Sequence, residues 1–207
     1  MHSGRGVVGR RKPFFLYPAA MQSTVPSRWG ERVSKLYSPA TWQHILQLGS
    51  AASYTFNPDA PLTDTMDSHR LALLAEQQGH QKAVVHEVSR RYFEEGVPLA
   101  DRASLLEVAE MCGVTGAAEF LDSDAGTAEV MQSVKAHQDA GIHSIPVTPL
   151  IPSQLITVRP RLQTRKIAGA QVALISSGNF SATVRGSASP QEFLAVFRQI
   201  EQHWAAA

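Results

Sequence analysis

The sequence predicts an α/β protein in which a block of helices separates a short first strand from a strand–strand–helix ending. The apolar run Pro13–Tyr17 is typical of a buried strand. Apolar residues then recur at three- and four-residue steps through residues 63–140, as they do along amphipathic helices. Two short apolar runs around a Ser-Ser-Gly-Asn turn follow. With 43% hydrophobic residues in a chain of 207, we expect one domain with an inserted subdomain.

The start of the chain is rich in glycine and arginine, so we predict that residues 1–12 are disordered and that the domain covers residues 13–207. Residues 27–48 show helical spacing, but the segment must break or kink at Pro39, which lacks the N–H that a helix interior needs. A loop is expected at residues 57–61, where two prolines lie close together.

Capping residues and glycines divide the central block into helices. We expect Asp67 or Ser68 to cap a helix that ends near Gly79, and a second helix to end at Gly96. A third helix is predicted to begin after Asp101. Two further helices are predicted over shorter stretches, at residues 116–121 and 124–140.

The last third of the chain reads as strands around an extra loop. Ile142–Val147 is predicted to be a turn that enters a strand. Residues 148–171 hold three prolines, four basic residues and no acid, and they show no clean period, so we predict a loop. Val172–Ile175 and Phe180–Arg185 are predicted to form a hairpin, and Pro190 opens the final helix.

Composition and charge argue against several classes of partner. The net charge is +1, and the basic stretch Arg159–Lys166 lacks the interleaved aromatic residues of single-strand binding surfaces, so no nucleic acid is expected. No apolar run reaches 18 residues, which argues against a membrane span. A cytoplasmic location is expected, with a mitochondrion or another organelle as the alternative, because the N-terminus contains arginine and no acid.

Five short motifs follow one another in a set order: Phe14-Phe-Leu-Tyr-Pro18, Thr65-Met-Asp-Ser-His-Arg70, Tyr92-Phe-Glu-Glu-Gly96, Gly141-Ile-His-Ser-Ile-Pro146 and Val184-Arg-Gly-Ser-Ala-Ser-Pro190. In this order and spacing they resemble the FrnE-like branch of the DsbA family. That branch is related to 2-hydroxychromene-2-carboxylate isomerase and to the kappa-class glutathione transferases. The resemblance implies a thioredoxin-like fold with an inserted all-helical subdomain.

Two features depart from the family pattern. In the family, a strand and an active-site helix with Cys-x-x-Cys precede the strand placed here at Phe14, whereas no cysteine lies before Phe14 in this chain. We therefore expect the first strand and the active-site helix to be missing. The family also runs directly from the cis-proline strand into the hairpin. Residues 148–171 are thus either a true insertion or an artefact of the gene prediction.

Thiol–disulfide exchange needs an attacking thiolate and a nearby resolving thiol. The single cysteine, Cys112, lies near the end of a predicted helix, where the helix dipole does not stabilise a thiolate. We interpret Cys112 as a buried structural residue that forms no internal disulfide. No catalytic residue is assigned, and the histidines and acids show no spacing typical of a metal site.

The resemblance implies that substrate binds around the proline of the fourth motif. X-Pro bonds adopt the cis form more readily than other peptide bonds. In thioredoxin-like proteins the residue before the cis-proline offers its backbone to an extended peptide or to glutathione. Here that role falls on Ile145, before Pro146, with His143 and Ser144 lining the groove. The alternative is an ordinary trans proline that opens a strand.

The resemblance adds three further candidates. Ser187 lies where kappa-class enzymes receive the γ-glutamyl end of glutathione, but Ala188 replaces their aspartate, which counts against glutathione. A helix cap is the plainer role for Ser187. In the family Ser68 and His69 face the substrate groove. Their alternative roles are an N-cap and a surface residue.

The sequence therefore predicts a DsbA-like thiol-disulfide oxidoreductase family member that is catalytically incomplete. The alternatives are a non-enzymatic, peptide-binding module and a glutathione-dependent transferase or isomerase. We expect a peptide or thiol substrate and no cofactor other than glutathione. Without its first strand the sheet would expose an edge and apolar surface, so low solubility or a homodimer is also expected.

Overall fold

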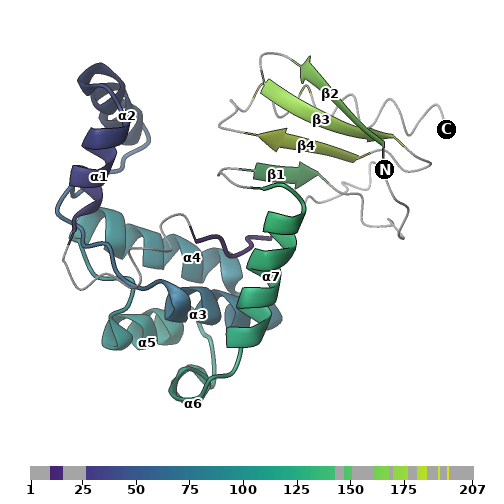
Figure 1. The fold of residues 1–207 in the computed structure, drawn as a ribbon. Helices are drawn as coiled ribbons and strands as arrows, with labels where there is room; N and C mark the ends of the chain where they lie inside the picture. The colour runs from purple at the N-terminus through teal and green to yellow at the C-terminus, as the bar shows by residue number, and fades with distance from the viewer. Residues whose placement is uncertain are drawn as a thin grey trace, which may run out of the picture. The chain divides into compact units, whose positions relative to one another are not determined.

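The computed structural model describes residues 10–15, 27–142, 147–150, 161–167, 170–176 and 181–185, together with Gln191 and Ala195. The chain divides into two compact units, residues 1–136 and 137–207. The described elements of the first unit are helices, and those of the second are four strands and the end of one helix (Figure 1). Among the described residues, no helix is long and apolar enough to cross a membrane.

A helical hairpin opens the first unit. Helix α1 (Trp29–Leu36) is followed by α2 (Pro39–Ala51). The Ser38 hydroxyl accepts a hydrogen bond from the Thr41 backbone N–H at 3.2 Å and so caps α2. Pro39 occupies the first position of α2, where its missing N–H costs nothing. The predicted break at Pro39 is confirmed.

The central block contains the helices that the sequence predicts, with small shifts at their ends. Asp101 caps α5 by accepting a hydrogen bond from the Ser104 backbone N–H at 3.0 Å, as expected. Gly96 has φ +75° and ends the second helix in the left-handed conformation. The predicted cap at Asp67 or Ser68 is wrong, because the N-cap residue of α3 is Thr65. The elements are α3 (Met66–Gln77), α4 (Gln81–Arg90), the π-helical turn η2 (Arg91–Glu95), α5 (Arg102–Met111), α6 (Ala117–Asp122) and α7 (Thr127–Asp139).

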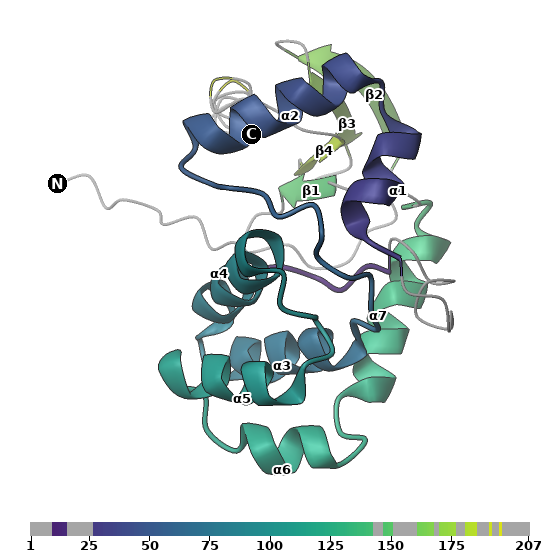
Figure 2. The same cartoon turned by 90° about the vertical axis from the view of Figure 1, so that its left-hand side faces the viewer.

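The core of this block lies between α3, α4, α5 and α6 (Figure 2). Leu71, Val84 and Val108 come from three different helices and are fully buried. Each such side chain stabilises the fold by about 1.5–3 kcal/mol through burial alone. A second, aromatic cluster around Trp29, Ala60 and Tyr92 joins α1 to the loop before α3 and to η2.

A charged network lies where α4 passes into η2. Arg90 donates to Glu87 at 2.7 Å and to Glu95 at 2.6 Å. Arg91 contacts Glu87 at 3.1 Å and Glu107 of α5 at 2.7 Å. Hydrogen bonds from Arg90, and then from Arg91, lower the pKa of Glu87 to about 2, against the opposing effect of burial. Glu87 is therefore the carboxylate through which this junction responds to acid.

We expect Glu87→Gln to flatten the acid dependence of stability. The pKa of Glu87 is lower in the folded chain than in the unfolded one, so its stabilisation is complete above about pH 4.5 and is lost as the pH falls toward about 2. Because the network is partly solvated, we expect a loss of about 1 kcal/mol at pH 6 that shrinks toward zero near pH 2. Urea unfolding across this range measures it. Glu119→Gln on the exposed face of α6 is the control, and an equal effect there would contradict the prediction.

The N-terminal segment differs from both predictions made for it. Residues 13–15 form no strand, and the rest of the predicted Pro13–Tyr17 strand lies outside the described residues. Arg11 and Lys12, which the sequence places in a disordered start, form hydrogen bonds with α4 and α3. Their partners lie more than 60 residues away in sequence, so no local pattern could have revealed them.

The second unit contains an antiparallel sheet of four described strands in the order β1-β4-β3-β2. The predicted hairpin is confirmed: β3 pairs with β4, and Val172 lies opposite Val184. The final helix predicted from Pro190 is described only at Gln191 and Ala195, which are helical. The strands are β1 (Val147–Leu150), β2 (Arg161–Ile167), β3 (Ala170–Ser176) and β4 (Ser181–Arg185).

The loop predicted over residues 148–171 is wrong at residues 148–150, which belong to β1, throughout β2, and at residues 170–171, which belong to β3. Strand β2 pairs with β3 along its whole length, from Arg161 opposite Ser176 to Ile167 opposite Ala170. Its sequence has polar residues at both odd and even positions, so it lacks the alternation by which a strand is recognised. Pairing with one neighbour on a sheet edge tolerates this polarity.

Candidate functional site

Two of the seven residues predicted to bind substrate can be placed, namely Ser68 and His69 at the start of α3. The cis form of the proline in the fourth motif stays a prediction. The other five residues lie outside the described part of the chain: His143, Ser144, Ile145, Pro146 and Ser187.

Ser68 lies in the first turn of α3 and is half-buried. Its hydroxyl donates a hydrogen bond to the Thr65 backbone carbonyl at 2.8 Å. Just before the helix, the Asp64 carboxylate accepts from the Met66 backbone N–H at 2.8 Å. The Ser68 hydroxyl proton is thus used within the helix itself, which is a structural role.

His69 is half-buried and not the surface residue that the sequence left open as an alternative. Its ring meets the Phe15 ring edge-on, with centroids 5.3 Å apart. Burial lowers the pKa of His69, and this effect outweighs a hydrogen bond with the Phe14 backbone and the charge of Asp64, which both raise it. The imidazole is therefore neutral at neutral pH, so it has one N–H donor and one acceptor nitrogen.

A pocket of about 350 Å³ lies beside His69, between residues 11–13 and the helices α3, α4 and α7. Part of its lining is apolar and includes Leu73, Val85 and Val130. Charged and polar groups make up much of the remaining lining, so the pocket suits a ligand with both apolar and polar parts. They are Lys12, His69, Glu76, Gln81, Glu129 and Ser133.

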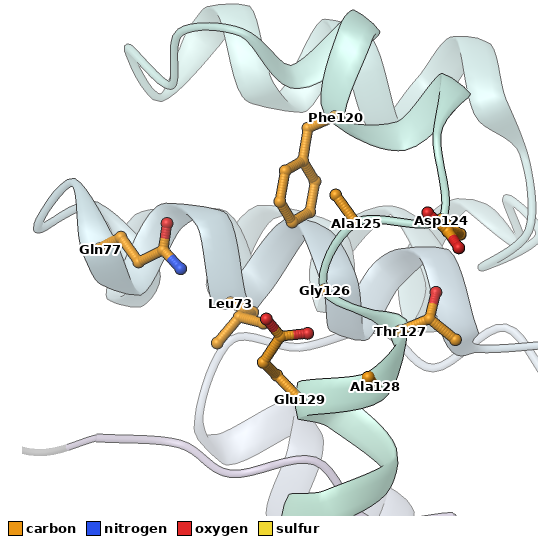
Figure 3. Close-up of a pocket in the computed structure, with 9 residues that line it drawn as sticks. All are labelled: Leu73, Gln77, Phe120, Asp124, Ala125, Gly126, Thr127, Ala128 and Glu129. Carbon is orange, nitrogen blue, oxygen red and sulfur yellow. The ribbon is translucent and has the colours of Figure 1, made fainter.

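A second pocket, of about 500 Å³, lies between α3 and the connection from α6 to α7 (Figure 3). Figure 3 shows the Phe120 ring pointing toward Leu73 of α3. Gly126 has φ +79°, and a Cβ placed there would lie 2.7 Å from the Phe120 ring. Only glycine lets the connection run this close to the ring. Asp124 and Glu129 make the rim acidic.

Cys112 is the C-cap residue of α5 and is half-buried against the helical core. Burial raises the pKa of its thiol, and the charge of Glu87 raises it further, while Arg91 opposes them. These features favour the protonated thiol and agree with the predicted structural role. Among the described residues, no group of three or more His, Cys, Asp or Glu side chains is placed to hold a metal ion.

Three polar residues at these sites were not singled out from the sequence. Arg70 is 4% exposed and Gln81 is 8% exposed, and both are bonded to backbone groups far away in the chain. Glu76 binds the start of the chain. Arg70 closes the Thr65–Arg70 motif, and its place in that motif was the signal available in the sequence. Glu76 and Gln81 carry no such signal, because polar residues are common at helix ends.

Comparison with known proteins places most of these elements in one family. The chain matches the family described as DSBA-like thioredoxin domain over residues 10–151, which is more than half of its length. The matched range covers helices α1 to α7 and ends just after β1. No curated protein matches the chain.

Proposed function

Because the chain belongs to the family of DSBA-like thioredoxin domains, we propose that it binds a peptide or thiol substrate without itself carrying out dithiol–disulfide exchange. The single observation that carries the proposal is the position of its one cysteine. Cys112 lies at the C-terminal end of α5, half-buried, with the pKa of its thiol raised by burial. Exchange through a mixed disulfide needs the opposite, a stabilised thiolate with a second thiol in reach.

The helix dipole adds to this argument. A helix N-terminus stabilises a nearby anion, and a C-terminus destabilises it. Reactive cysteines of disulfide oxidoreductases are typically found where a positive environment favours the thiolate. The proposed role for Cys112 is therefore packing against the core, and the proposed activity of the chain is binding.

We assign the chain to the FrnE-like branch from the order of its motifs. Two of them mark helix boundaries in the structure. Thr65–Arg70 begins α3, and Tyr92–Gly96 ends the helix that continues from α4. Tyr92 is buried and Gly96 is left-handed, so both residues have a structural reason for their identity. These roles support the assignment.

Insulin reduction with dithiothreitol tests the proposed lack of exchange. We expect the chain and its Cys112→Ser variant to give the uncatalysed rate, because one raised-pKa thiol cannot complete the cycle. A thioredoxin with an intact Cys-x-x-Cys serves as the positive control. Catalysis that disappears in Cys112→Ser would show that this thiol is reactive. Catalysis that survives the substitution would reveal another chemistry, and either result would contradict the proposal.

Binding is tested separately. We expect the chain to bind reduced, alkylated insulin B chain saturably, and not to be retained on immobilised glutathione. Retention that free glutathione reverses would favour the transferase or isomerase alternative. The absence of any peptide binding would remove the proposed role.

A further inference from the structure

The N-terminal segment of the chain lies across α3 and α4 in the manner of a bound peptide. Residues 10–15, drawn in purple in Figures 1 and 2, pass beside these helices without forming a helix or strand. Side chains of His69, Glu76 and Gln81 contact the segment at successive points. We call the surface formed by these three residues and the adjoining 350 Å³ pocket the α3–α4 groove.

Gln81 recognises the backbone of the segment. Its carboxamide Oε1 accepts from the Arg11 backbone N–H at 2.8 Å, and its Nε2 donates to the Arg11 backbone carbonyl at 2.9 Å. Both polar backbone groups of one residue are thus paired, as they are between neighbouring strands. With the segment in place Gln81 is 8% exposed, so these two hydrogen bonds are largely shielded from water. Such a clamp takes an extended backbone of any sequence.

Glu76 recognises basic side chains on either side of that clamp. Lys12 Nζ lies 2.9 and 3.1 Å from the two carboxylate oxygens, and Arg10 contacts one of them at 3.7 Å. Residues 10 and 12 lie on the same side of an extended chain, because its side chains alternate. Gln81 also donates to Glu76 at 3.1 Å and so holds the carboxylate in place.

His69 contacts the far end of the segment, and the adjoining pocket leaves room beside it. His69 lies seven residues before Glu76, which is two turns along the same face of α3. It bonds to the Phe14 backbone and meets the Phe15 ring. The pocket is bordered by Arg11, Lys12 and Pro13 but is not filled by them. The groove is therefore larger than the segment that occupies it.

We propose that the α3–α4 groove is a receptor for extended peptides that carry basic residues at alternate positions followed by proline and an aromatic residue. The Arg10–Phe15 segment of the same chain occupies the groove and competes with peptides from other proteins. The charge of Glu76 and the backbone clamp of Gln81 give the site this preference. The inference goes beyond the proposed function, because it uses neither Cys112 nor residues 143–146, and the insulin assay does not bear on it.

A peptide in trans must displace a segment whose effective concentration is high, since it belongs to the same chain. We therefore weaken the binding of the segment to the groove with Lys12→Glu in the full chain. This substitution replaces the ion pair with Glu76 by repulsion between two carboxylates. The side chain of Lys12 is 47% exposed, so the substitution leaves the core intact. The probe is fluorescein-labelled Gly-Arg-Arg-Lys-Pro-Phe-Phe, which copies residues 9–15, and fluorescence anisotropy reports its binding.

We expect the Lys12→Glu chain to bind the probe roughly tenfold more tightly than the unmodified chain does. A tenfold gain is the effect expected when the competing segment loses one ion pair with the groove. Arg28→Glu is the matched control, because Arg28 has a similarly exposed side chain and forms an ion pair with Asp59 elsewhere. It should behave as the unmodified chain does. Adding Glu76→Lys to Lys12→Glu should abolish the gain, since the segment regains its partner and the groove repels the probe.

A second probe tests the backbone clamp. N-methylation of the second arginine of the peptide removes the N–H that Gln81 accepts, and we expect roughly tenfold weaker binding. Circular dichroism confirms that every variant is folded. Failure of the folded Lys12→Glu chain to bind the probe would overturn the proposal. Equal binding by Lys12→Glu, Arg28→Glu and the double variant would also overturn it, because the probe would then bind elsewhere.

Discussion

Replacing Arg70 by alanine is expected to lower the free energy of unfolding of the helical unit by about 3 kcal/mol or more. The side chain is 5% exposed, and Arg70 is among the most buried charged residues described in the chain. Its guanidinium also lies over the Phe120 ring, 5.6 Å from the centroid, and bonds to Asp67 at 2.7 Å. It donates to four backbone carbonyls where α6 passes into α7: Phe120, Leu121, Ser123 and Ala125.

The large effect follows from what the substitution leaves behind. Alanine would leave several carbonyls without their charged donor, and each buried group left unpaired costs about 1–3 kcal/mol. Arg70→Lys should recover only part of the loss, because an ammonium cannot reproduce the planar fork of donors. The connection that these bonds hold also forms the wall of the 500 Å³ pocket. The shape of this pocket therefore depends on Arg70.

Urea unfolding followed by circular dichroism measures the effect, and Arg102→Ala is the control. Arg102 also binds the α6 region, through the Ala118 carbonyl and Asp122, but its side chain is 31% exposed. One guanidinium nitrogen of Arg102 is buried without a hydrogen-bond partner. Removing the side chain therefore relieves a destabilising burial at the same time as it removes two hydrogen bonds. We expect it to cost less than about 1 kcal/mol. Equal losses in the two variants would show that burial of the Arg70 network is not the source of its stability.

The helices were predictable because their signals are local. Apolar spacing located the helical segments, and a capping aspartate at residue 101 and a left-handed glycine at residue 96 fixed two of their boundaries. Pro39 correctly divided α1 from α2. The hairpin of β3 and β4 followed from two apolar runs around a short turn. In each case the residues that determine the structure lie within a few positions of one another.

The predictions failed where the structure depends on distant partners. Residues 11 and 12 looked disordered because their partners, Gln81 and Glu76, are 70 and 64 positions away. Strand β2 looked like a loop because its order comes from pairing with β3. The site was only partly predictable for the same reason. The resemblance pointed to His69, but the segment that covers it could be found only from the fold.

The aromatic cluster at Trp29 was not predicted as a unit, although it determines how the helical hairpin is attached. Trp29 is 8% exposed and lies edge-on to Trp42, Phe56 and Phe93, with centroids 5.2 to 5.7 Å apart. Its indole N–H donates to the Asn57 backbone carbonyl at 2.5 Å. The cluster therefore joins α1 and α2 to η2 through one central ring.

Trp29→Ala is expected to release α1 and α2 while the rest of the helical unit stays folded. Loss of a buried tryptophan costs about 3–5 kcal/mol, which corresponds to amide exchange that is roughly a hundredfold to a few thousandfold faster through local opening. Hydrogen–deuterium exchange should show this increase over residues 29–51 and little change over residues 66–136. Those residues keep the separate core around Leu71.

Two control variants separate the ring from its surroundings. Trp29→Phe keeps an aromatic ring but loses the bond to Asn57, so we expect a loss of about 1–2 kcal/mol, smaller than that of alanine. Tyr37→Ala removes an aromatic side chain that is 47% exposed, and exchange should not change. Uniformly faster exchange throughout the helical unit in Trp29→Ala would mean that the two clusters unfold together. In that case the helical hairpin of α1 and α2 would unfold in one cooperative unit with the core of α3, α4 and α5.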